Sequence, residues 1–407
     1  MKKLCLLLLF FISFIFSLSA QIFYPPPSLV PYLDNPPEIT SRAAVLIDAE
    51  TGTFIFSKNA DDVIPPASLT KLMTMHIVMK EIKAGRASFD ELIPVTTESW
   101  AQSQPPRSSL MFLAPGQTVT LREILLGLAV ASGNDAAVAA ALRFAPTMKE
   151  FGLMMTREAQ NMGLYITRFV ESSGISGYNR TTAAEFASFS RQYLYKHPES
   201  LDMFHSVLSM SYPMSDNVAE RYKNNPRTIV QDNRNTLLRT FDGADGLKTG
   251  FINESGYNVS LTAERDNTRY IAVILGAPNT RWGSRIRDED GEKLLTWAFD
   301  YFKTVRPVIG NIENVKVWKS KKGTAGLELA DSPNFTASIG RAHSLNFETV
   351  IPNPIIAPLE AGTLAGYLKI SDEHGELYRV PLALKTAIEK GNIFKRFWHS
   401  FLLLFNR

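Results

Sequence analysis

Cysteine is almost absent from this chain of 407 residues, whose single copy, Cys5, lies in the extreme N-terminus. We therefore expect no disulfide bond, no cysteine-based metal site and no thiol nucleophile in the mature protein. Histidine is scarce as well, and neither an H-E-x-x-H pair nor a G-x-S-x-G elbow occurs. These absences disfavour a zinc peptidase and a Ser-His-Asp hydrolase, so covalent chemistry must use another arrangement. No metal and no cofactor is expected.

A strong excess of charge of one sign is also missing. Lys and Arg together number 43, Asp and Glu 40, and the formal net charge is +3. A net charge this small gives no indication of a nucleic-acid partner. Hydrophobic residues make up 45% of the chain and charged residues 20%, a composition typical of a globular protein that buries a core. The length predicts two or three domains.

Both ends of the chain carry targeting patterns. Two lysines, an apolar run over 4–16 and the tail Ser17-Leu18-Ser19-Ala20 predict a secretory signal peptide over residues 1–20. The alternative is a retained N-terminal anchor. Proline clusters within residues 21–38 are typical of an extended leader. We therefore expect a protein secreted across the cytoplasmic membrane, in the periplasm or at the outer face of that membrane.

The C-terminal segment 385–407 has the pattern of an amphipathic helix. Its large apolar residues recur at helical spacing, with basic and polar residues on the other side: Phe394, Phe397, Trp398, Phe401, Leu404 and Phe405 against Lys395, Arg396, His399 and Ser400. The segment is too short and too polar to span a bilayer, which favours a helix lying in the headgroup plane. The alternative is a helix docked on the protein's own core.

Between the ends, strand patterns flank a helix-rich middle. Strands are predicted around a turn at residues 50–52 and around Asp266-Asn267, and helical patterns cover 67–82, 121–143, 147–162, 182–196 and 290–303. This order predicts an α+β domain over 39–305, in which a helical subdomain is inserted into an antiparallel sheet flanked by helices. Alternating patterns over 306–384 predict a small all-β domain. The polar segment 209–236 is interpreted as an extended loop.

Three short motifs carry the candidate chemistry. The first, Ser68-Leu69-Thr70-Lys71, follows two prolines at the start of a helical pattern. A spacing of three places Ser68 and Lys71 on one helix face, close enough for the amine to take the hydroxyl proton. Alone, the same tetrad is more often a helix cap followed by a solvated lysine.

The second motif, Ser132-Gly133-Asn134, interrupts a run of Ala, Val and Leu. Polar residues in such a setting need hydrogen-bond partners, which a turn facing a cleft would supply. A helix–helix turn with a capping side chain is the equal alternative.

The third motif, Lys248-Thr249-Gly250, precedes a strand pattern. It is no Walker A loop, because Leu247 separates Gly246 from Lys248 and no helix pattern follows. An edge strand with Lys, Thr and a glycine that lets a ligand approach the backbone suits binding of a substrate carboxylate.

In this order, S-x-x-K, S-x-N and K-T-G resemble the signature of the serine penicillin-recognising enzymes. The surrounding segments PPASLTKLMT, SSLMFLAPGQTVTLREILLGLAVASGNDAA and GADGLKTGFINESGYNVS resemble the D-alanyl-D-alanine carboxypeptidases, the low-molecular-mass class C penicillin-binding proteins. The resemblance implies a β-lactamase/transpeptidase-like fold. It also implies peptidoglycan stem peptides ending in D-Ala-D-Ala as substrates, β-lactams as covalent inhibitors, and a role in wall biosynthesis and cell shape.

The resemblance implies a role for each motif residue. Ser68 would be the acylated nucleophile and Lys71 its general base. Ser132, helped by Lys248, would pass the proton to the departing D-alanine.

Substrate binding would fall to a second set of residues. Asn134 would bind the substrate amide, and Thr249 and Arg287 would hold its terminal carboxylate. The backbone N–H groups of Ser68 and Phe251 would form the oxyanion hole. Phe251 departs from the family, which commonly has His or another polar residue there, and Arg285 is the alternative to Arg287.

Other functions stay open at this point. A class A β-lactamase would need a deacylating Glu, and Glu171 occupies that region of the sequence but sits in F-V-E-S-S-G, which resembles the carboxypeptidase pattern. A DD-endopeptidase would use the same motifs. A membrane-attached wall-binding protein without activity is the non-enzymatic alternative.

Overall fold

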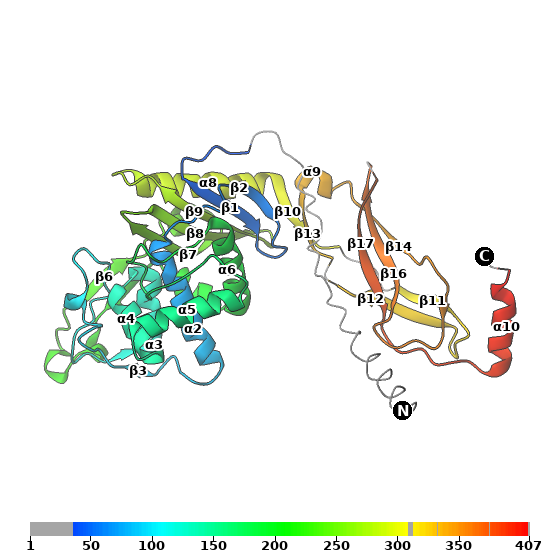
Figure 1. Cartoon of the computed structure of the whole chain (residues 1–407), viewed down its shortest axis with the longest axis horizontal. Coiled ribbons are helices and arrows are strands. Elements are labelled where there is room, and N and C mark those ends of the chain that lie inside the picture. The colour runs from blue at the N-terminus through cyan, green and yellow to red at the C-terminus, as the bar shows by residue number, and fades with distance from the viewer. Residues whose placement is uncertain (1–35, 308–311, 332, 374, 406–407) are drawn as a thin grey trace, which may run out of the picture.

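The computed structural model describes residues 36–307, 312–331, 333–373 and 375–405. The predicted signal peptide and the leader up to residue 35 lie outside the described residues. The protein is α+β, with a domain of sheet and helices followed by an all-β domain and a terminal helix (Figure 1).

A five-stranded antiparallel sheet forms the centre of the first domain. Its strands lie in the order β2 (Phe54–Lys58), β1 (Ala43–Asp48), β9 (Thr268–Ala277), β8 (Gly256–Arg265) and β7 (Ala244–Ile252). The three inner strands are almost continuously buried, as expected when helices cover both faces. Strands β1 and β9 are mostly apolar, whereas β8 also buries Asn258, Ser260 and Thr262. Helix α8 (Gly283–Tyr301) packs on one face and α6 (Ala183–Lys196) on the other (Figure 1). Strand β7, which carries K-T-G, is therefore an edge strand, as predicted.

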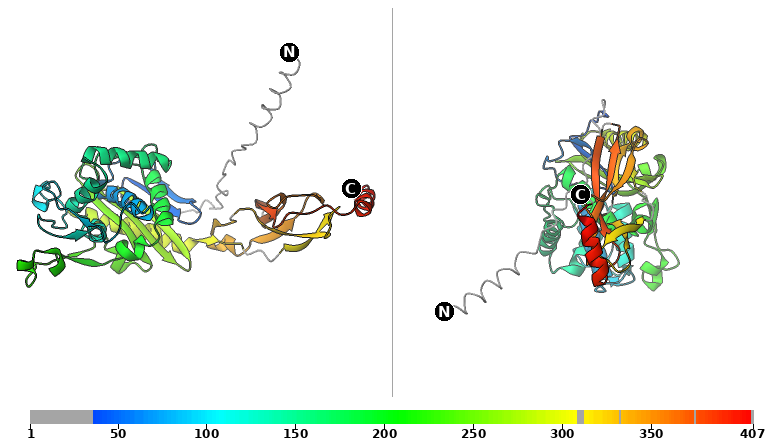
Figure 2. Two further views of the ribbon diagram at one scale, coloured as in Figure 1. Left: turned by 90° about the horizontal axis from the view of Figure 1, so that it is seen from below. Right: turned by 90° about the vertical axis from the view of Figure 1, so that its right-hand side faces the viewer.

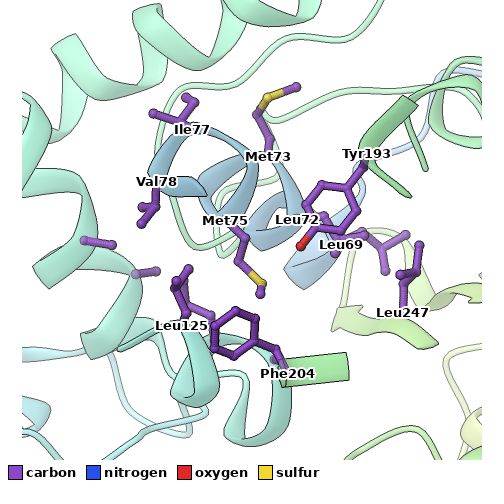
Figure 3. Packing of buried hydrophobic residues seen from close by; sticks show 14 of the residues in the cluster. Leu69, Leu72, Met73, Met75, Ile77, Val78, Leu125, Tyr193, Phe204 and Leu247 are labelled. Carbon is purple, nitrogen blue, oxygen red and sulfur yellow. The ribbon is translucent and has the colours of Figure 1, made fainter. Parts of the chain in front are cut away.

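A helical subdomain lies beside the sheet and is built around α2 (Thr70–Lys83). The first ten residues of α2 are all buried, so this helix is enclosed on every side. Helix α2 packs against α4 (Asn134–Phe144) and α5 (Met148–Asn161). The subdomain also contains α3 (Leu121–Leu126) and the small ribbon of β3 (Leu92–Ile93) and β4 (Val119–Thr120). Figure 3 shows Met75 of α2 reaching toward Leu125 and Phe204.

Two segments differ from the sequence-based expectation. The helical pattern over 121–143 is divided, because a wide turn at Gly127–Ala131 and a left-handed Ser132 (φ 58°) separate α3 from α4. The segment 209–236, expected to be an extended loop, contains a two-stranded ribbon of β5 (Ser209–Tyr212) and β6 (Ile229–Asp232). Helix α7 (Leu237–Thr240) follows it.

The C-terminal domain is a β-structure with two small apolar clusters. Its six-stranded sheet has the order β14 (Asn346–Val350), β16 (Leu364–Asp372), β17 (Gly375–Leu384), β12 (Thr324–Leu329), β11 (Ile312–Trp318) and β15 (Ile355–Ile356). The short helix α9 (Ile339–Ala342) follows β13 (Phe335–Ser338), which pairs with β10 (Phe302–Val305) directly after α8. The chain thus passes between the domains through a hydrogen-bonded ribbon.

Buried polar contacts reinforce this junction. The Asp48 carboxylate, at the end of β1, accepts hydrogen bonds at 2.8 Å from the hydroxyls of Thr304 and Thr336. Glu50 accepts hydrogen bonds from Arg306 and Asn334. The two domains therefore meet in a defined orientation and give an elongated molecule (Figure 2).

Helix α10 (Ile393–Leu403) lies at the far end of the molecule, beyond the β-domain (Figures 1 and 2). The Nδ1 atom of His399 accepts a hydrogen bond from the Lys319 N–H at 2.8 Å, and its ring packs against Trp318. The apolar side chains of the helix remain exposed, Phe394 at 83% and Phe397 at 78%. None of the helices in the described part of the chain is both long and apolar enough to cross a bilayer.

Candidate active site

A cleft of about 1070 Å³ opens between β7 and the helical subdomain. Its walls come from the start of α2, the Ser132 turn, the loop over 171–179, the edge of β7 and the start of α8. Of the residues predicted from sequence, it is lined by Ser68, Ser132, Asn134, Thr249, Gly250, Phe251 and Arg287. The two predicted lysines, Lys71 and Lys248, are buried behind its surface. The three motifs therefore meet at one place.

Ser68 lies in a single 3₁₀ turn, Ala67–Leu69, which leads directly into α2. Ala67 has a left-handed conformation (φ 51°), a costly one for a residue with a Cβ atom. In this arrangement the Lys71 Nζ atom lies 3.0 Å from the Ser68 Oγ atom. This is the contact that the three-residue spacing predicts.

The amine of Lys71 is buried and has three polar neighbours, of which Ser68 is one. It lies 2.8 Å from Asn134 Oδ1 and 2.6 Å from the carbonyl oxygen of Ser173. Burial lowers the pKa of Lys71 to about 7, because the charged amine loses its hydration; the carboxylates of Glu171 and Asp135 act in the opposite direction. Near neutral pH a large fraction of this amine is therefore unprotonated and able to accept a proton.

The Ser132 turn is fixed by Asp135. Its buried carboxylate accepts hydrogen bonds from the backbone N–H groups of Met111 at 2.8 Å and Leu113 at 3.0 Å. Gly133 is packed so tightly that a Cβ atom there would lie 2.9 Å from the Met111 nitrogen. The turn and the segment over 105–113 thus form one rigid wall of the cleft. Sequence reasoning did not identify Asp135.

Strand β7 presents the third motif. Lys248 is 1% exposed and donates to the carbonyl oxygen of Thr249 at 3.1 Å. Burial, followed by the nearby cations Lys71, Arg234 and Arg287, lowers the pKa of Lys248 well below its usual value.

The glycine of K-T-G lies against the segment that bears Ser68. A Cβ atom on Gly250 would lie 2.8 Å from the Ser68 nitrogen and 3.0 Å from the Pro66 oxygen. Gly250 therefore lets this segment approach β7, and it also lines the cleft; the approach of a ligand to its backbone stays a prediction. Next to it, the ring of Phe251 packs on Tyr257 with centroids 4.4 Å apart.

The two candidate arginines on α8 differ clearly in position. The Arg287 side chain is 6% exposed, lines the cleft and is paired with Asp288 at 2.6 Å. The Arg285 side chain is 73% exposed and pairs with Glu289 on the outer surface. Geometry therefore favours Arg287 as the cleft residue.

Arg234, at the end of the segment 209–236, also lines the cleft and was missed. The flanking amides hold it there: Asn233 donates to the Val207 oxygen at 3.0 Å and Asn235 to the Gly246 oxygen at 3.0 Å. A polar triplet with two buried asparagines just before a helix is the signal that could have revealed it. Within the described ranges, no cluster of three His, Cys, Asp or Glu residues could hold a metal ion.

This fold is that of the penicillin-binding proteins. The structure is similar to penicillin binding protein 5 from Haemophilus influenzae, with a TM-score of 0.76, 26% identity, and coverage of 88% of this chain and 100% of that one. It is also similar to penicillin-binding protein D2 from Listeria monocytogenes in its ampicillin-bound form, with a TM-score of 0.55, 28% identity, and coverage of 65% of this chain and 100% of that one.

The sequence comparisons give the family. Residues 32–279 match the family model of D-alanyl-D-alanine carboxypeptidases, and residues 303–390 match that of the penicillin-binding protein 5 C-terminal domain. The D-alanyl-D-alanine carboxypeptidase DacC of Escherichia coli (strain K12) is 30% identical over 378 residues, which are 91% of this chain and 90% of that protein. The chain therefore belongs to the D-alanyl-D-alanine carboxypeptidase family, a serine-type hydrolase, which confirms the resemblance found in the motifs.

Proposed function

We propose that this enzyme removes the terminal D-alanine from peptidoglycan pentapeptides through an acyl-enzyme on Ser68. The observation that carries the proposal is the pair of Ser68 Oγ and Lys71 Nζ, 3.0 Å apart at the floor of the cleft, with the pKa of Lys71 lowered to about 7. A neutral amine at this distance is positioned to accept the hydroxyl proton as oxygen attacks the carbonyl carbon.

In the acylation step, Ser68 Oγ forms a bond to the carbonyl carbon of the penultimate D-alanine, and the oxygen of that carbonyl becomes negative. The backbone N–H groups of Ser68 and Phe251 are the proposed donors to it. The close approach of β7 to Ser68 at Gly250 supports this pairing. The proton taken by Lys71 would pass by way of Ser132, helped by Lys248, to the nitrogen of the leaving D-alanine as its C–N bond breaks.

Three polar side chains would orient the substrate in this step. Thr249 and the buried guanidinium of Arg287 would hold the terminal carboxylate of the leaving D-alanine. Asn134, whose Oδ1 atom accepts from Lys71, would offer its amide N–H₂ to the peptide. Water then attacks the ester and releases the shortened peptide. A β-lactam would acylate Ser68 in the same way, with slow release of the product.

We also propose that α10 holds the enzyme on the outer face of the cytoplasmic membrane. The exposed aromatic face and the basic residues Lys395 and Arg396 support an interfacial position. The β-domain would then act as a spacer that raises the cleft toward the peptidoglycan, because α10 and the domain that contains the cleft lie at opposite ends of the molecule (Figure 2).

The test uses residues 21–407 in detergent, with Ser68→Ala as the matched control. A pentapeptide ending in D-Ala-D-Ala and a cross-linked peptide dimer are incubated separately and analysed by mass spectrometry. Loss of one alanine from the pentapeptide, absent with Ser68→Ala, is the expected result. Cleavage of the dimer alone would make the protein an endopeptidase, and no cleavage of either would favour a wall-binding role.

A further inference from the structure

The loop over 171–179, between α5 and α6, is organised around one carboxylate. Glu171 accepts hydrogen bonds from the Ser173 N–H and Ser173 hydroxyl, both at 2.6 Å, from the Gly174 N–H at 2.7 Å and from the Asn179 side-chain amide at 2.9 Å. The Ser176 N–H lies at 3.4 Å. Such charge-assisted hydrogen bonds are about twice as strong as neutral ones, so this carboxylate determines the shape of the loop.

The loop in turn contacts the segment that bears Ser68 and Lys71. The Ser173 carbonyl oxygen lies 2.6 Å from Lys71 Nζ, the shortest contact of that amine. Gly174, with φ 82°, is pressed against the Ala67 carbonyl, since a Cβ atom there would lie 1.8 Å from that oxygen. A further bond runs from the Thr74 hydroxyl to the Ser172 oxygen at 2.8 Å. A shift of this loop would therefore displace the lysine amine.

The same contacts argue against Glu171 as a base that activates water. Both of its oxygens already accept hydrogen bonds within the loop, and the residues lining the cleft include Gly174 and Ile175 but not Glu171. The Glu171 carboxylate therefore holds groups of its own loop in place and is not available to a water molecule in the cleft.

We propose that Glu171 is a positioning residue that holds the Ser173 carbonyl, and with it the Lys71 amine, in place for the reaction at Ser68. The inference rests on the proposed role of Lys71 as the base. Glu171 also acts electrostatically: its charge is the largest influence that raises the pKa of Lys71 against the effect of burial. The other charged groups that act on this amine are Asp135, Arg234 and Lys248.

The charge of Glu171 determines in which direction the pH dependence of acylation should shift when Glu171 is replaced. Glu171→Gln removes a negative charge, so the pKa of Lys71 falls further and the amine stays neutral at lower pH. The acidic limb of the acylation rate should therefore move to lower pH. The maximal rate should fall by between about tenfold and a hundredfold, because the amine is displaced from Ser68. A merely structural role would lower the amount of active protein without moving the limb.

The experiment measures acylation by a fluorescent penicillin and release of D-alanine between pH 4 and 9, using residues 21–407. Glu185→Gln is the matched control, because Glu185 holds the N–H groups of Ile166 at 2.9 Å and Thr167 at 2.7 Å in a neighbouring loop and is not among the groups acting on Lys71. We expect this control to keep the wild-type pH limb.

The outcomes separate the two ideas. Absence of acylation and of D-alanine release in the wild type would refute the proposed function itself. An active wild type with an unchanged rate and pH limb in Glu171→Gln would overturn the positioning role, and so would normal acylation with a trapped acyl-enzyme. If Glu171→Gln does not fold, Ser173→Ala removes one hydroxyl donor to Glu171 and should slow acylation roughly two- to tenfold; an unchanged rate would overturn the inference.

Discussion

The catalytic domain and the β-domain bury different kinds of residues. The catalytic domain encloses ionisable side chains around the cleft, among them Lys71, Lys248 and Asp135. In the described part of the β-sheet domain, the polar residues that are buried as a whole are the uncharged Ser320 and Thr336, and the enclosed Asp372 carboxylate is paired with Arg341 at 2.7 Å. Burying a charge costs free energy that a purely structural core avoids. The difference indicates that the first domain sacrifices stability for chemistry and that the second is built to hold its shape.

The largest effect is expected when the buried amine of Lys71 in the catalytic domain is removed. Lys71→Met should lower the rate of acylation by a factor of about 10² to 10⁴, because the general base is lost, without lowering the melting temperature. The measurements are labelling by fluorescent penicillin and thermal unfolding. Lys149→Met, at an exposed position on α5, is the control and should label like the wild type. Full labelling of Lys71→Met would contradict the assignment of the base.

The next largest effect is expected in the pH dependence of the acylation rate of the wild type. Because the pKa of Lys71 is about 7, its amine becomes protonated as the pH falls below that value and can no longer accept the Ser68 proton. Acylation should therefore decrease about tenfold per pH unit below pH 6. Stopped-flow measurements with a fluorescent penicillin test this. A rate that is constant from pH 8 to pH 5 would exclude Lys71 as the titrating base.

Core substitutions should separate the domains. Met75→Ala and Leu382→Ala both remove side chains that are 0% exposed, and each should cost about 2–5 kcal/mol in its own domain. Only Met75→Ala should reduce D-alanine release from a soluble pentapeptide on mild heating, since Met75 lies on the helix that carries Lys71. Thermal unfolding and peptide assays over a temperature series check this. Equal loss of activity in both variants would mean that the β-domain supports the cleft directly.

Features that depend on a local sequence pattern could be predicted, whereas contacts between distant segments could not. The motifs around Ser68, Ser132 and Lys248 identified the family, the sheet edge and the cleft, because each combines polar residues with a local pattern. Arg287 lines the same cleft. The roles of these residues in the reaction remain predictions.

Contacts between distant segments could not be predicted. Asp135 acts on Met111, 24 residues away, and Glu171 acts on Lys71 through Ser173. The ribbon of β5 and β6 was missed because its strands are only four residues long. In β5 the buried Met210 and Tyr212 alternate with exposed serines, but two periods are too few to predict a strand, and β6 is largely exposed. The same applies to the short β15 of the C-terminal domain.

The smallest effect concerns the end of the molecule farthest from the cleft. Arg396→Gln on α10 should weaken binding to vesicles containing anionic lipid about fivefold, because one basic residue near such a surface contributes about 1 kcal/mol. Binding to neutral vesicles should change little, and the difference should shrink at high salt, where exposed charges are screened. Co-sedimentation of residues 21–407 with vesicles measures both. Lys149→Gln, which removes the same charge from the catalytic domain, is the control. If this control loses as much affinity as Arg396→Gln, net charge rather than α10 drives attachment, and the β-domain would lose its proposed role as a spacer between membrane and cleft.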